Sequence, residues 1–420
     1  MRRVVVTGLG FVTSIGNNKA EVLDSLRHVR SGIAVMKELC THDSPIRLTG
    51  NVKNYHFPSA DFEEWTFPDK ATLTREQLRS MTPNAVYANT AMRECIRDAA
   101  LPPELVSNPR TALMTASGGS MWLSYENLHT MVTRGISKCQ PLAIVNSIPG
   151  SLYINLCPIF KILGGALGFS SACSSSSHAF GFAYDTITLG RQDRIFVVGA
   201  EDCNRHSVLP FSSIRALSVQ TDPTKAPRAF DKHRDGFVAA GGAATLLLES
   251  LESAQARNAH IYAEVAGWAQ SSDGYNVLAP DPTGSGMIRC MELAIESAGI
   301  TKNDVDYINA HATSTTVGDM AEVKAIRKVF SGGKVPYVSS TKSLTGHGLS
   351  LAGALEAGIC CLSLQEGFMP ISANITELDP QCEGIPIITQ PIDAKPHIVM
   401  SNSGGFGGTN VSLVLREFSN

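Results

Sequence analysis

Cys173 is the residue of this sequence whose setting is most typical of a nucleophile. It lies in the run Ser170-Ser171-Ala172-Cys173-Ser174-Ser175-Ser176-Ser177, which leads into a predicted helix. Unpaired backbone N–H groups at a helix start stabilise negative charge, so this position is predicted to lower the thiol pKa below its usual value of about 8.5 and to favour a thiolate nucleophile. The alternative is that Cys173 is one of ten cysteines with an ordinary packing role.

Two histidines occupy similar places later in the chain. His311 follows a predicted strand and begins a hydroxyl-rich loop, and His347 ends a Ser/Thr-rich segment after the next predicted strand. A single histidine is more often a surface or core residue than a catalyst, but both of these follow strands, where the active sites of layered α/β proteins form. We therefore expect Cys173, His311 and His347 to meet in one active site at the carboxyl ends of strands.

Short β-branched runs alternate with longer amphipathic stretches, a rhythm typical of layered α/β proteins with buried strands. The runs predict strands at residues 3–7, 111–115, 194–198, 243–249, 262–269, 307–310, 337–339, 385–388, 397–401 and 411–416. The amphipathic stretches predict helices at residues 18–30, 82–99, 174–189, 285–298, 321–330 and 351–366. Gly8-Leu9-Gly10 is interpreted as a tight turn, since Thr13 stands where a dinucleotide-binding fingerprint needs its third glycine.

The second half of the chain repeats the strand and helix rhythm of the first. The sequence therefore predicts two similar halves, residues 1–255 carrying Cys173 and residues 256–420 carrying both histidines. No Gly/Ser-rich linker separates them, so we expect them to pack as one body. No run of about 18 uncharged apolar residues occurs, so no membrane span is expected.

Composition restricts the partners and the compartment. The 420 residues carry a net charge of −3, which gives no electrostatic reason to expect nucleic acid as a partner. The ten cysteines form no CxxC pair and no disulfide framework, so we expect reduced thiols in the cytoplasm. The sequence lacks GxxxxGK[ST], HExxH and GxSxG motifs, which removes the main support for phosphate-loop, zinc-protease and serine-hydrolase chemistry, and no metal site is predicted.

Four ordered motifs resemble those of β-ketoacyl-[acyl-carrier-protein] synthases of the elongating types I and II, condensing enzymes of the thiolase superfamily. They are Ser171-Ala172-Cys173, His311 with its threonine-rich loop, Lys342-Ser343-Leu344-Thr345-Gly346-His347, and Gly405-Phe406-Gly407-Gly408-Thr409-Asn410. The resemblance covers essentially the whole chain. It implies an α/β fold of the thiolase-like, five-layer αβαβα type, made of two similar halves and usually assembled as a homodimer.

The resemblance also implies a reaction. Such enzymes condense an acyl thioester with malonyl-[acyl-carrier protein], with loss of CO₂, in fatty-acid or type II polyketide-like chain elongation. The substrates are carried on the 4′-phosphopantetheine of acyl carrier protein, and the enzyme itself binds no cofactor. Cys173 would take the acyl group, and neutral His311 and His347 would donate N–H groups to the enolate oxygen that decarboxylation leaves.

Charged residues near the histidines take supporting roles in this resemblance. Lys342 would lie behind the histidines and help to fix their protonation, with Glu356 as its buried partner. Asp319 and Glu322 would support the site structurally without taking part in the chemistry.

The remaining site residues follow from the same resemblance. The backbone N–H groups of Cys173 and Phe406 would form the oxyanion hole, and Phe406, flanked by glycines, would act as a gate between empty and acylated enzyme. The candidates for substrate and carrier contacts are Thr313 and Thr315 along the pantetheine arm, Gly119 at the base of the acyl pocket, Phe211 on the pocket wall, and Arg75 and Arg79 on the surface that docks the carrier protein.

The sequence departs from the family pattern at several of these places. The usual HGTSTP reads His311-Ala312-Thr313-Ser314-Thr315-Thr316, and the usual NSFGFGGTN has Gly404 in place of its first aromatic residue. Gly119 stands where some relatives carry a larger, blocking side chain, which predicts an open path for longer or stiffer acyl chains. Glu76 stands where a lysine is usual, which predicts a carrier protein different from the housekeeping one.

Two alternatives remain open at this point. A biosynthetic thiolase would need a second catalytic cysteine near the C-terminal glycine loop, and residues 402–410 contain none. A non-catalytic, chain-length-setting partner subunit of a ketosynthase heterodimer would typically lack the nucleophile, whereas Cys173 and both histidines are present.

Overall fold

The computed structural model describes residues 2–40 and 43–419. Ten strands form the main sheet, in the order β10-β9-β11-β12-β8-β1-β7-β6-β4-β5, and β2 and β3 form a separate pair. The strands are β1 (Val4–Val12), β2 (Ile33–Val35), β3 (Leu48–Gly50), β4 (Thr111–Ala116), β5 (Ala166–Phe169), β6 (Arg194–Glu201), β7 (Gly242–Ser250), β8 (Ala263–Ser272), β9 (Tyr307–Asn309), β10 (Tyr337–Ser339), β11 (Ile398–Gly405) and β12 (Thr409–Arg416). The helices are α1 (Lys19–Arg27), α2 (Arg75–Leu78), α3 (Pro83–Asp98), α4 (Pro103–Val106), α5 (Met121–Arg134), α6 (Ala143–Asn146), α7 (Ser151–Phe160), α8 (Ser175–Thr188), α9 (Arg205–Val208), α10 (Leu251–Ala256), α11 (Ser285–Ser297), α12 (Gly318–Val329), α13 (Lys342–Thr345) and α14 (Ala352–Glu366).

The main sheet consists of two halves with the same strand order. With β2 and β3 left out, the strands of each half can be numbered one to five along the chain. In both halves the order across the sheet is then 3-2-4-5-1, which is β5-β4-β6-β7-β1 in the first half and β10-β9-β11-β12-β8 in the second. In each half the first two pairings of this order are parallel and the last two antiparallel. A short antiparallel pairing of β1 with β8 joins the halves. The repeated rhythm of the sequence therefore corresponds to a repeated topology.

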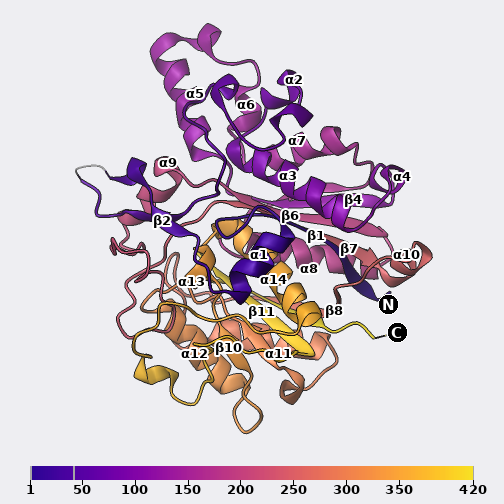
Figure 1. The fold of residues 1–420 in the computed structure, drawn as a ribbon, viewed down its shortest axis with the longest axis vertical. Coiled ribbons are helices and arrows are strands. Elements are labelled where there is room, and N and C mark those ends of the chain that lie inside the picture. Colours follow the sequence, from indigo (N-terminus) through magenta and orange to yellow (C-terminus); the bar gives the residue numbers. More distant parts are fainter. Residues whose placement is uncertain (1, 41–42, 420) are drawn as a thin grey trace.

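Helices and sheet halves alternate in five layers. Helices α8 and α14 each follow the edge strand of their own half and pack against each other between the two halves. Helix α3 packs on the outer side of the first half, and α11 packs on the second half with α12 beside it. Figure 1 shows this succession from α3, through β1 and β7, α8 and α14, and β8 and β11, to α11 and α12. The predicted αβαβα architecture is confirmed.

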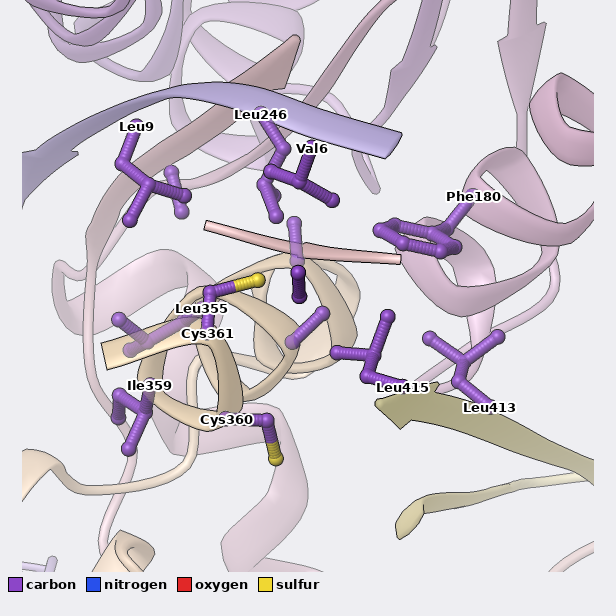
Figure 2. Packing of buried hydrophobic residues seen from close by; sticks show 14 of the residues in the cluster. Val6, Leu9, Phe180, Leu246, Leu355, Ile359, Cys360, Cys361, Leu413 and Leu415 are labelled. Atoms are coloured by element: carbon purple, nitrogen blue, oxygen red, sulfur yellow. The ribbon is translucent and has the colours of Figure 1, made fainter. Parts of the chain in front are cut away.

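The central helix layer contains the largest hydrophobic core. Its side chains pack between residues of both sheet halves, as Figure 2 shows for Val6, Leu9, Phe180, Leu246, Leu355, Ile359, Cys360, Cys361, Leu413 and Leu415. Because α14 is covered on nearly every side, its sequence is apolar all round instead of amphipathic. No helix within the described residues is both long and apolar enough to cross a membrane. The shared core holds the strand ends of the two halves in fixed relative positions.

The interpretation of Gly8-Leu9-Gly10 as a turn is wrong, because β1 continues through these residues. Helix α3 packs so closely on this strand that a Cβ atom on Gly10 would lie 1.9 Å from the backbone oxygen of Ala91. These glycines therefore serve the close approach of helix and strand.

Two further differences concern short strands. Residues 385–388, predicted as a strand, form only an isolated bridge between Ile387 and Val338. Conversely, β5 was not predicted, because four residues with the sequence Ala-Leu-Gly-Phe give little periodic signal. Within the described chain β5 pairs with β4 alone and forms one edge of the sheet, where Leu167 is exposed.

Candidate active site

Cys173 lies in a tight turn between β5 and α8. Ala172 has a left-handed backbone with φ 52°, which turns the chain sharply just before the cysteine. The serine run closes this turn: Ser171 N–H donates to Ser175 Oγ at 2.8 Å, and Ser175 Oγ donates to the Ala172 carbonyl at 2.6 Å. Helix α8 begins at Ser175, so Cys173 is held at the mouth of a helix as the sequence predicted.

The prediction of a lowered Cys173 pKa is wrong for the resting structure. Cys173 is half-buried as a residue, but protein atoms crowd its thiol, and this burial raises the pKa to about 12. The positive charge of Lys342 acts in the opposite direction and is the smaller effect. Cys173 is therefore a thiol at rest and must lose its proton as it attacks.

His311 and His347 face each other near the ends of two parallel strands. His311 follows β9, and His347 follows β10 and the short helix α13. Their ring centroids lie 5.4 Å apart with the planes at 83°. Burial, and secondarily the charge of Lys342, lowers the pKa of both imidazoles well below the usual value. Both rings are therefore neutral at physiological pH, and each carries one N–H donor.

Hydrogen bonds and one ring contact hold His347 against residues 237–240. His347 N–H donates to the Val238 carbonyl at 2.7 Å, and its own carbonyl accepts from Ala240 N–H at 3.0 Å. The ring of Phe237 packs edge-on against the imidazole at 5.4 Å between centroids. These contacts fix the position of the His347 ring in the site.

The neutral histidines predict how stability depends on pH. In the unfolded chain a histidine takes up a proton below about pH 6.5, whereas in the folded protein burial holds the pKa of His311 and His347 well below this value. The unfolded state then binds more protons. The two groups should therefore lower the free energy of unfolding as the pH falls below about 6.5, by roughly 1.4 kcal/mol per pH unit for each histidine.

Buried carboxyls act in the opposite direction, so the measurement needs a matched variant. Burial raises the pKa of Asp319 and of Glu201 to about 7, and these groups stabilise the fold as the pH falls toward the unfolded-state pKa of about 4. Denaturation at about pH 7.5 and about pH 5.5 should show a loss of stability that is about 2–3 kcal/mol smaller in a His311→Gln/His347→Gln variant than in the wild type. The same pH dependence in both proteins would contradict the neutral, buried state of the histidines.

Two carboxylates hold the loop that carries His311. Glu322 accepts from the backbone N–H groups of His311 at 3.0 Å and Ala312 at 2.8 Å. Asp319 accepts from Ser314 N–H at 3.0 Å and from Thr315 N–H at 3.2 Å. Burial raises the pKa of both carboxyls, and Glu322 also accepts from the Asn402 side chain. Their supporting role stays a prediction.

Arg234 is a site residue whose role the sequence analysis missed. It donates to the backbone carbonyls of Thr315 at 3.0 Å and Thr316 at 2.7 Å, and it pairs with Asp379 at 2.7 Å. Its side chain is almost fully buried. Arg234 therefore ties the threonine-rich loop to the rest of the second half. The sequence offered no periodic signal here, because these residues lie outside helices and strands.

Lys342 and Glu356 form a buried ion pair. Lys342 lies at the start of α13 and Glu356 lies in α14, and both side chains are almost inaccessible to solvent. Burial raises the pKa of Glu356 to about 7, while Lys342 opposes that shift. The charge of Lys342 also lowers the pKa of both histidines, so the pair is electrostatically coupled to the site.

One cavity of ≈ 400 Å³ brings most of the predicted residues together. Cys173 is the one cysteine among the described residues that line it. The predicted residues on its wall are Cys173, Phe211, His311, Thr313, Thr315, Glu322, His347 and Phe406. Lining residues that the sequence analysis did not single out include Arg215, Asp235 and Asp273. Lys342, Glu356, Asp319, Gly119, Arg75 and Arg79 are not part of this wall.

Phe406 lies at the tip of the hairpin between β11 and β12. Gly407 and Gly408 follow it with φ 80° and 72°, a backbone that favours glycine. The Phe406 ring packs beside that of Phe211, with 6.1 Å between the ring centroids. A Cβ atom on Gly405 would lie 3.2 Å from the Cys173 nitrogen, so the hairpin lies directly beside the cysteine. Within the described chain neither Cys173 N–H nor Phe406 N–H donates a hydrogen bond to another residue, and their place in an oxyanion hole stays a prediction.

Gly119 lies between β4 and α5, packed against Pro149. Its φ of 83° is left-handed, and an added Cβ would lie 3.3 Å from the Cα atom of Pro149. Its place at the base of the acyl pocket stays a prediction. A larger residue here would combine backbone strain with any effect on chain length.

The strain at Gly119 gives a prediction of its own. Gly119→Ala should lower the free energy of unfolding by about 1–2 kcal/mol, because alanine disfavours the left-handed backbone. Gly165→Ala is the matched control, since its φ lies outside the left-handed range and an added Cβ would have no neighbour within 4 Å. Chemical denaturation should show a loss in the first variant and none in the second. Equal stability of Gly119→Ala and the wild type would show that the glycine is not required for the backbone.

Arg75 begins α2, and Arg79 follows its last residue. Neither arginine lines the cavity that contains Cys173. They border a second cavity of ≈ 430 Å³ with Asp61, Glu63 and Glu76. Arg75 already forms an ion pair with Glu63. The predicted carrier surface therefore contains acidic side chains beside its arginines, which weakens its positive potential.

Comparisons with known proteins give matches along most of the chain. The model of the β-ketoacyl synthase N-terminal domain matches residues 1–254, and the model of the C-terminal domain matches residues 262–376. The 3-oxoacyl-[acyl-carrier-protein] synthase 1 of Escherichia coli (strain K12) is 42% identical over 422 residues, covering 99% of each chain. A β-ketoacyl synthase crystal structure from Burkholderia phymatum STM815 has a TM-score of 0.91 and 33% identity, covering 100% of both chains. A type II polyketide synthase ketosynthase, solved with its acyl-carrier protein and bound to the hexaketide, has a TM-score of 0.88 and 26% identity, again covering 100% of both chains.

Proposed function

The chain belongs to the β-ketoacyl synthase family, and from this premise we propose that it condenses an acyl thioester with malonyl-[acyl-carrier protein]. The products are CO₂ and a 3-oxoacyl-[acyl-carrier protein] two carbons longer than the acyl group. The observation that carries the proposal is the meeting of Cys173, His311 and His347 on one cavity, with both imidazoles held neutral.

Acyl transfer comes first. Cys173 Sγ attacks the carbonyl carbon of the acyl thioester, and the pantetheine thiol of the carrier leaves with the proton that the Cys173 thiol gives up. One thioester replaces another, so the step needs little net free energy. The thiol proton passes to the departing pantetheine sulfur, which matters because burial raises the pKa of Cys173.

Decarboxylation follows in the same cavity. The bond between C2 of the malonyl group and its carboxylate breaks, CO₂ leaves, and the electron pair moves onto the thioester oxygen as an enolate. His311 and His347 each donate an N–H to this oxygen, and their burial in a low-dielectric site strengthens the interaction.

Condensation ends the cycle. C2 of the enolate attacks the carbonyl carbon of the acyl-cysteine, and the oxyanion that forms accepts from the backbone N–H groups of Cys173 and Phe406. Collapse of this intermediate leaves the new C–C bond and expels the Cys173 thiolate, which takes up a proton from solvent to restore the resting thiol. Movement of Phe406, which the following glycines permit, admits the malonyl group only after the cysteine is acylated.

Other residues support Cys173, His311 and His347. The charge of Lys342 adds to burial in keeping the histidines neutral, and Glu356 pairs with Lys342 behind the cavity wall. Thr313 and Thr315 offer hydroxyls on the cavity wall to the pantetheine arm, and Phe211 contributes to the wall beside Phe406. The residues need no bound cofactor, because the carrier brings the pantetheine thiol.

The carrier protein, the dimer and the compartment are part of the same proposal. Arg75 and Arg79 receive an acidic carrier, and the neighbouring Glu63 and Glu76 select which carrier binds.

A second copy of the chain pairs at the β5 edge, where Leu167 is exposed. Light scattering should give a dimer mass for the wild type and a smaller mass for Leu167→Lys, and a wild-type monomer would contradict the dimer.

Ten free thiols support a cytoplasmic location.

The function is tested by direct product analysis. Purified protein, an acylated carrier and malonyl-carrier should give CO₂ and 3-oxoacyl-carrier, identified by intact-protein mass spectrometry. No product across a series of acyl lengths would refute the condensing activity. Product from acetyl-coenzyme A alone, without malonyl groups, would instead favour a thiolase.

A further inference from the structure

Each serine of the run that follows the nucleophilic cysteine binds a different part of the protein. All four serines are buried. Ser175 closes the turn of the nucleophile, and Ser176 Oγ accepts from Ala354 N–H of α14 at 2.9 Å. Ser174 and Ser177 lie three positions apart at the start of α8, so they share one face of the helix. Both of them bind the hairpin between β11 and β12.

Ser174 is bonded to the base of the hairpin that carries Phe406. Ser174 Oγ lies 2.7 Å from Thr409 Oγ1, and it donates to the Ser171 carbonyl at 2.8 Å. Because Ser174 gives its one hydroxyl proton to Ser171, Thr409 is the donor of the other bond. Thr409 of β12 pairs with Gly405 of β11, directly before the tip of the hairpin. Two hydroxyl hydrogen bonds therefore join the turn of the nucleophile to the hairpin.

Ser177 holds the other strand of the hairpin. Its Oγ lies 2.7 Å from Ser403 Oγ, and both residues are buried. Ser403 belongs to β11 and comes two residues before Gly405. The bonds of Ser174 and Ser177 thus enclose residues 404–408, which are a phenylalanine and four glycines. This enclosed segment is flexible by composition, whereas both of its ends are fixed on the start of α8.

The tip of the hairpin is held by a more exposed set of contacts. Gly407 N–H donates to the Val277 carbonyl at 2.9 Å, and the Gly408 carbonyl accepts from Asp273 N–H at 2.8 Å. These partners lie in the loop after β8, where the Val277 side chain is exposed. Exposed loop contacts open more easily than buried ones. The tip can therefore move while the buried serine bonds keep the base of the hairpin in place.

We propose that Ser174 and Ser177 are positioning residues that fix both ends of the Phe406 segment and thereby couple malonyl decarboxylation to acylation of Cys173. The proposal rests on the condensing function above and deepens it by naming the residues that enforce the order of its two substrates. With both ends fixed, the gate opens only by rearrangement of the five enclosed residues.

Release of one end has a chemical consequence. The hairpin can then move away from Cys173 as a whole and admit malonyl-carrier to an enzyme that holds no acyl group. The C2 carboxylate leaves as CO₂, and the enolate takes a proton from solvent instead of forming a C–C bond. The product of this uncoupled reaction is acetyl-carrier.

The ratio of two rates tests the proposal. The first rate is CO₂ release from malonyl-carrier without an acyl donor, and the second is formation of 3-oxoacyl-carrier with both substrates present. Ser174→Ala and Ser177→Ala should each raise the ratio of the first rate to the second by about two- to tenfold, the shift that loss of one hydrogen bond typically causes. Both rates come from the same protein sample, so a loss of folded protein cancels in the ratio.

The serine run supplies a matched control. Ser176→Ala removes a hydroxyl from the same helix, but its partner is α14 and not the hairpin, so the ratio should stay unchanged even if stability falls. Thr409→Val removes the same bond from the hairpin side, and it should raise the ratio even if Ser174→Ala fails to fold. The double variant Ser174→Ala/Thr409→Val should stay within about twofold of either single variant, because both changes remove one shared bond.

The outcomes separate this proposal from the function on which it rests. No 3-oxoacyl-carrier from the wild type would refute the condensing function itself. Product from the wild type, combined with an unchanged ratio in Ser174→Ala and Thr409→Val or in Ser177→Ala, would overturn only the positioning role. An equal rise in Ser176→Ala would overturn it as well, since the ratio would then report a general loosening of α8.

Discussion

Cys173→Ala should abolish condensation and leave decarboxylation of malonyl-carrier. Removing an enzyme nucleophile typically lowers kcat by about 10⁴- to 10⁶-fold, because the covalent intermediate no longer forms. His311 and His347 serve a separate step and stay in place, so CO₂ release from malonyl-carrier should continue slowly without an acyl acceptor. The measurement pairs product mass spectrometry with release of labelled CO₂ from malonyl-carrier in the same samples.

A matched variant shows whether the thiol itself is required. Cys157→Ala removes a partly buried cysteine that does not line the cavity, and it should retain condensation. Full condensing activity in Cys173→Ala would refute the covalent mechanism. Loss of CO₂ release together with condensation would show that the cysteine also supports the enolate step. Iodoacetamide should label Cys173 faster at higher pH, since burial raises the pKa of its thiol.

The meeting of Cys173, His311 and His347 was predictable because each adjoins a regular element. β9 and β10 read as short apolar runs, and His311 and His347 come after them in the chain. Cys173 precedes a helix whose small residues pack against the other half. Parallel strands of a layered fold end at one edge, so residues at these ends approach one another without any detailed knowledge of packing.

The acidity of Cys173 was not predictable in the same way. The helix-start argument considers only nearby N–H groups, whereas burial of the thiol depends on segments far away in sequence. Gly405 of the β11–β12 hairpin comes against the Cys173 nitrogen, and Phe406 lies beside it. Such contacts between the two halves decide the desolvation of the thiol, and no local pattern reports them.

Loop residues were missed for a related reason. Arg234 holds the carbonyls of Thr315 and Thr316, yet it lies in a stretch with no helix or strand period. Gly10 was assigned to a turn, whereas in the structure it lies in β1 and α3 packs closely against it. Both roles depend on which element packs against the residue, which appears only in the tertiary structure.

His311→Ala and His347→Ala should each suppress decarboxylation while permitting acylation of Cys173. Removing one preorganised donor to a developing oxyanion typically lowers the rate by about 100- to 1000-fold. The two donors share one oxygen, so the double variant should lose less than the product of the single losses. CO₂ release is measured in a Cys173→Ala background, and acylation is measured as the mass shift of each single histidine variant with acyl-carrier.

Asparagine variants distinguish a donor from a base. An asparagine amide keeps an N–H donor and cannot accept a proton at physiological pH, so His311→Asn and His347→Asn should decarboxylate faster than the alanine variants if donation is the role. Because burial holds the pKa of both histidines well below 6.5, the rate in the Cys173→Ala background should be flat between about pH 8 and about pH 6.5. A rate that falls over this range with an apparent pKa of about 7, and still does so when Glu356, whose own pKa burial raises to about 7, is replaced by Gln, would mean that a histidine titrates there, and the neutral donor role would have to be abandoned. Unchanged CO₂ release in both alanine variants would equally remove the histidines from the enolate step and assign stabilisation of that oxygen to other donors on the cavity wall.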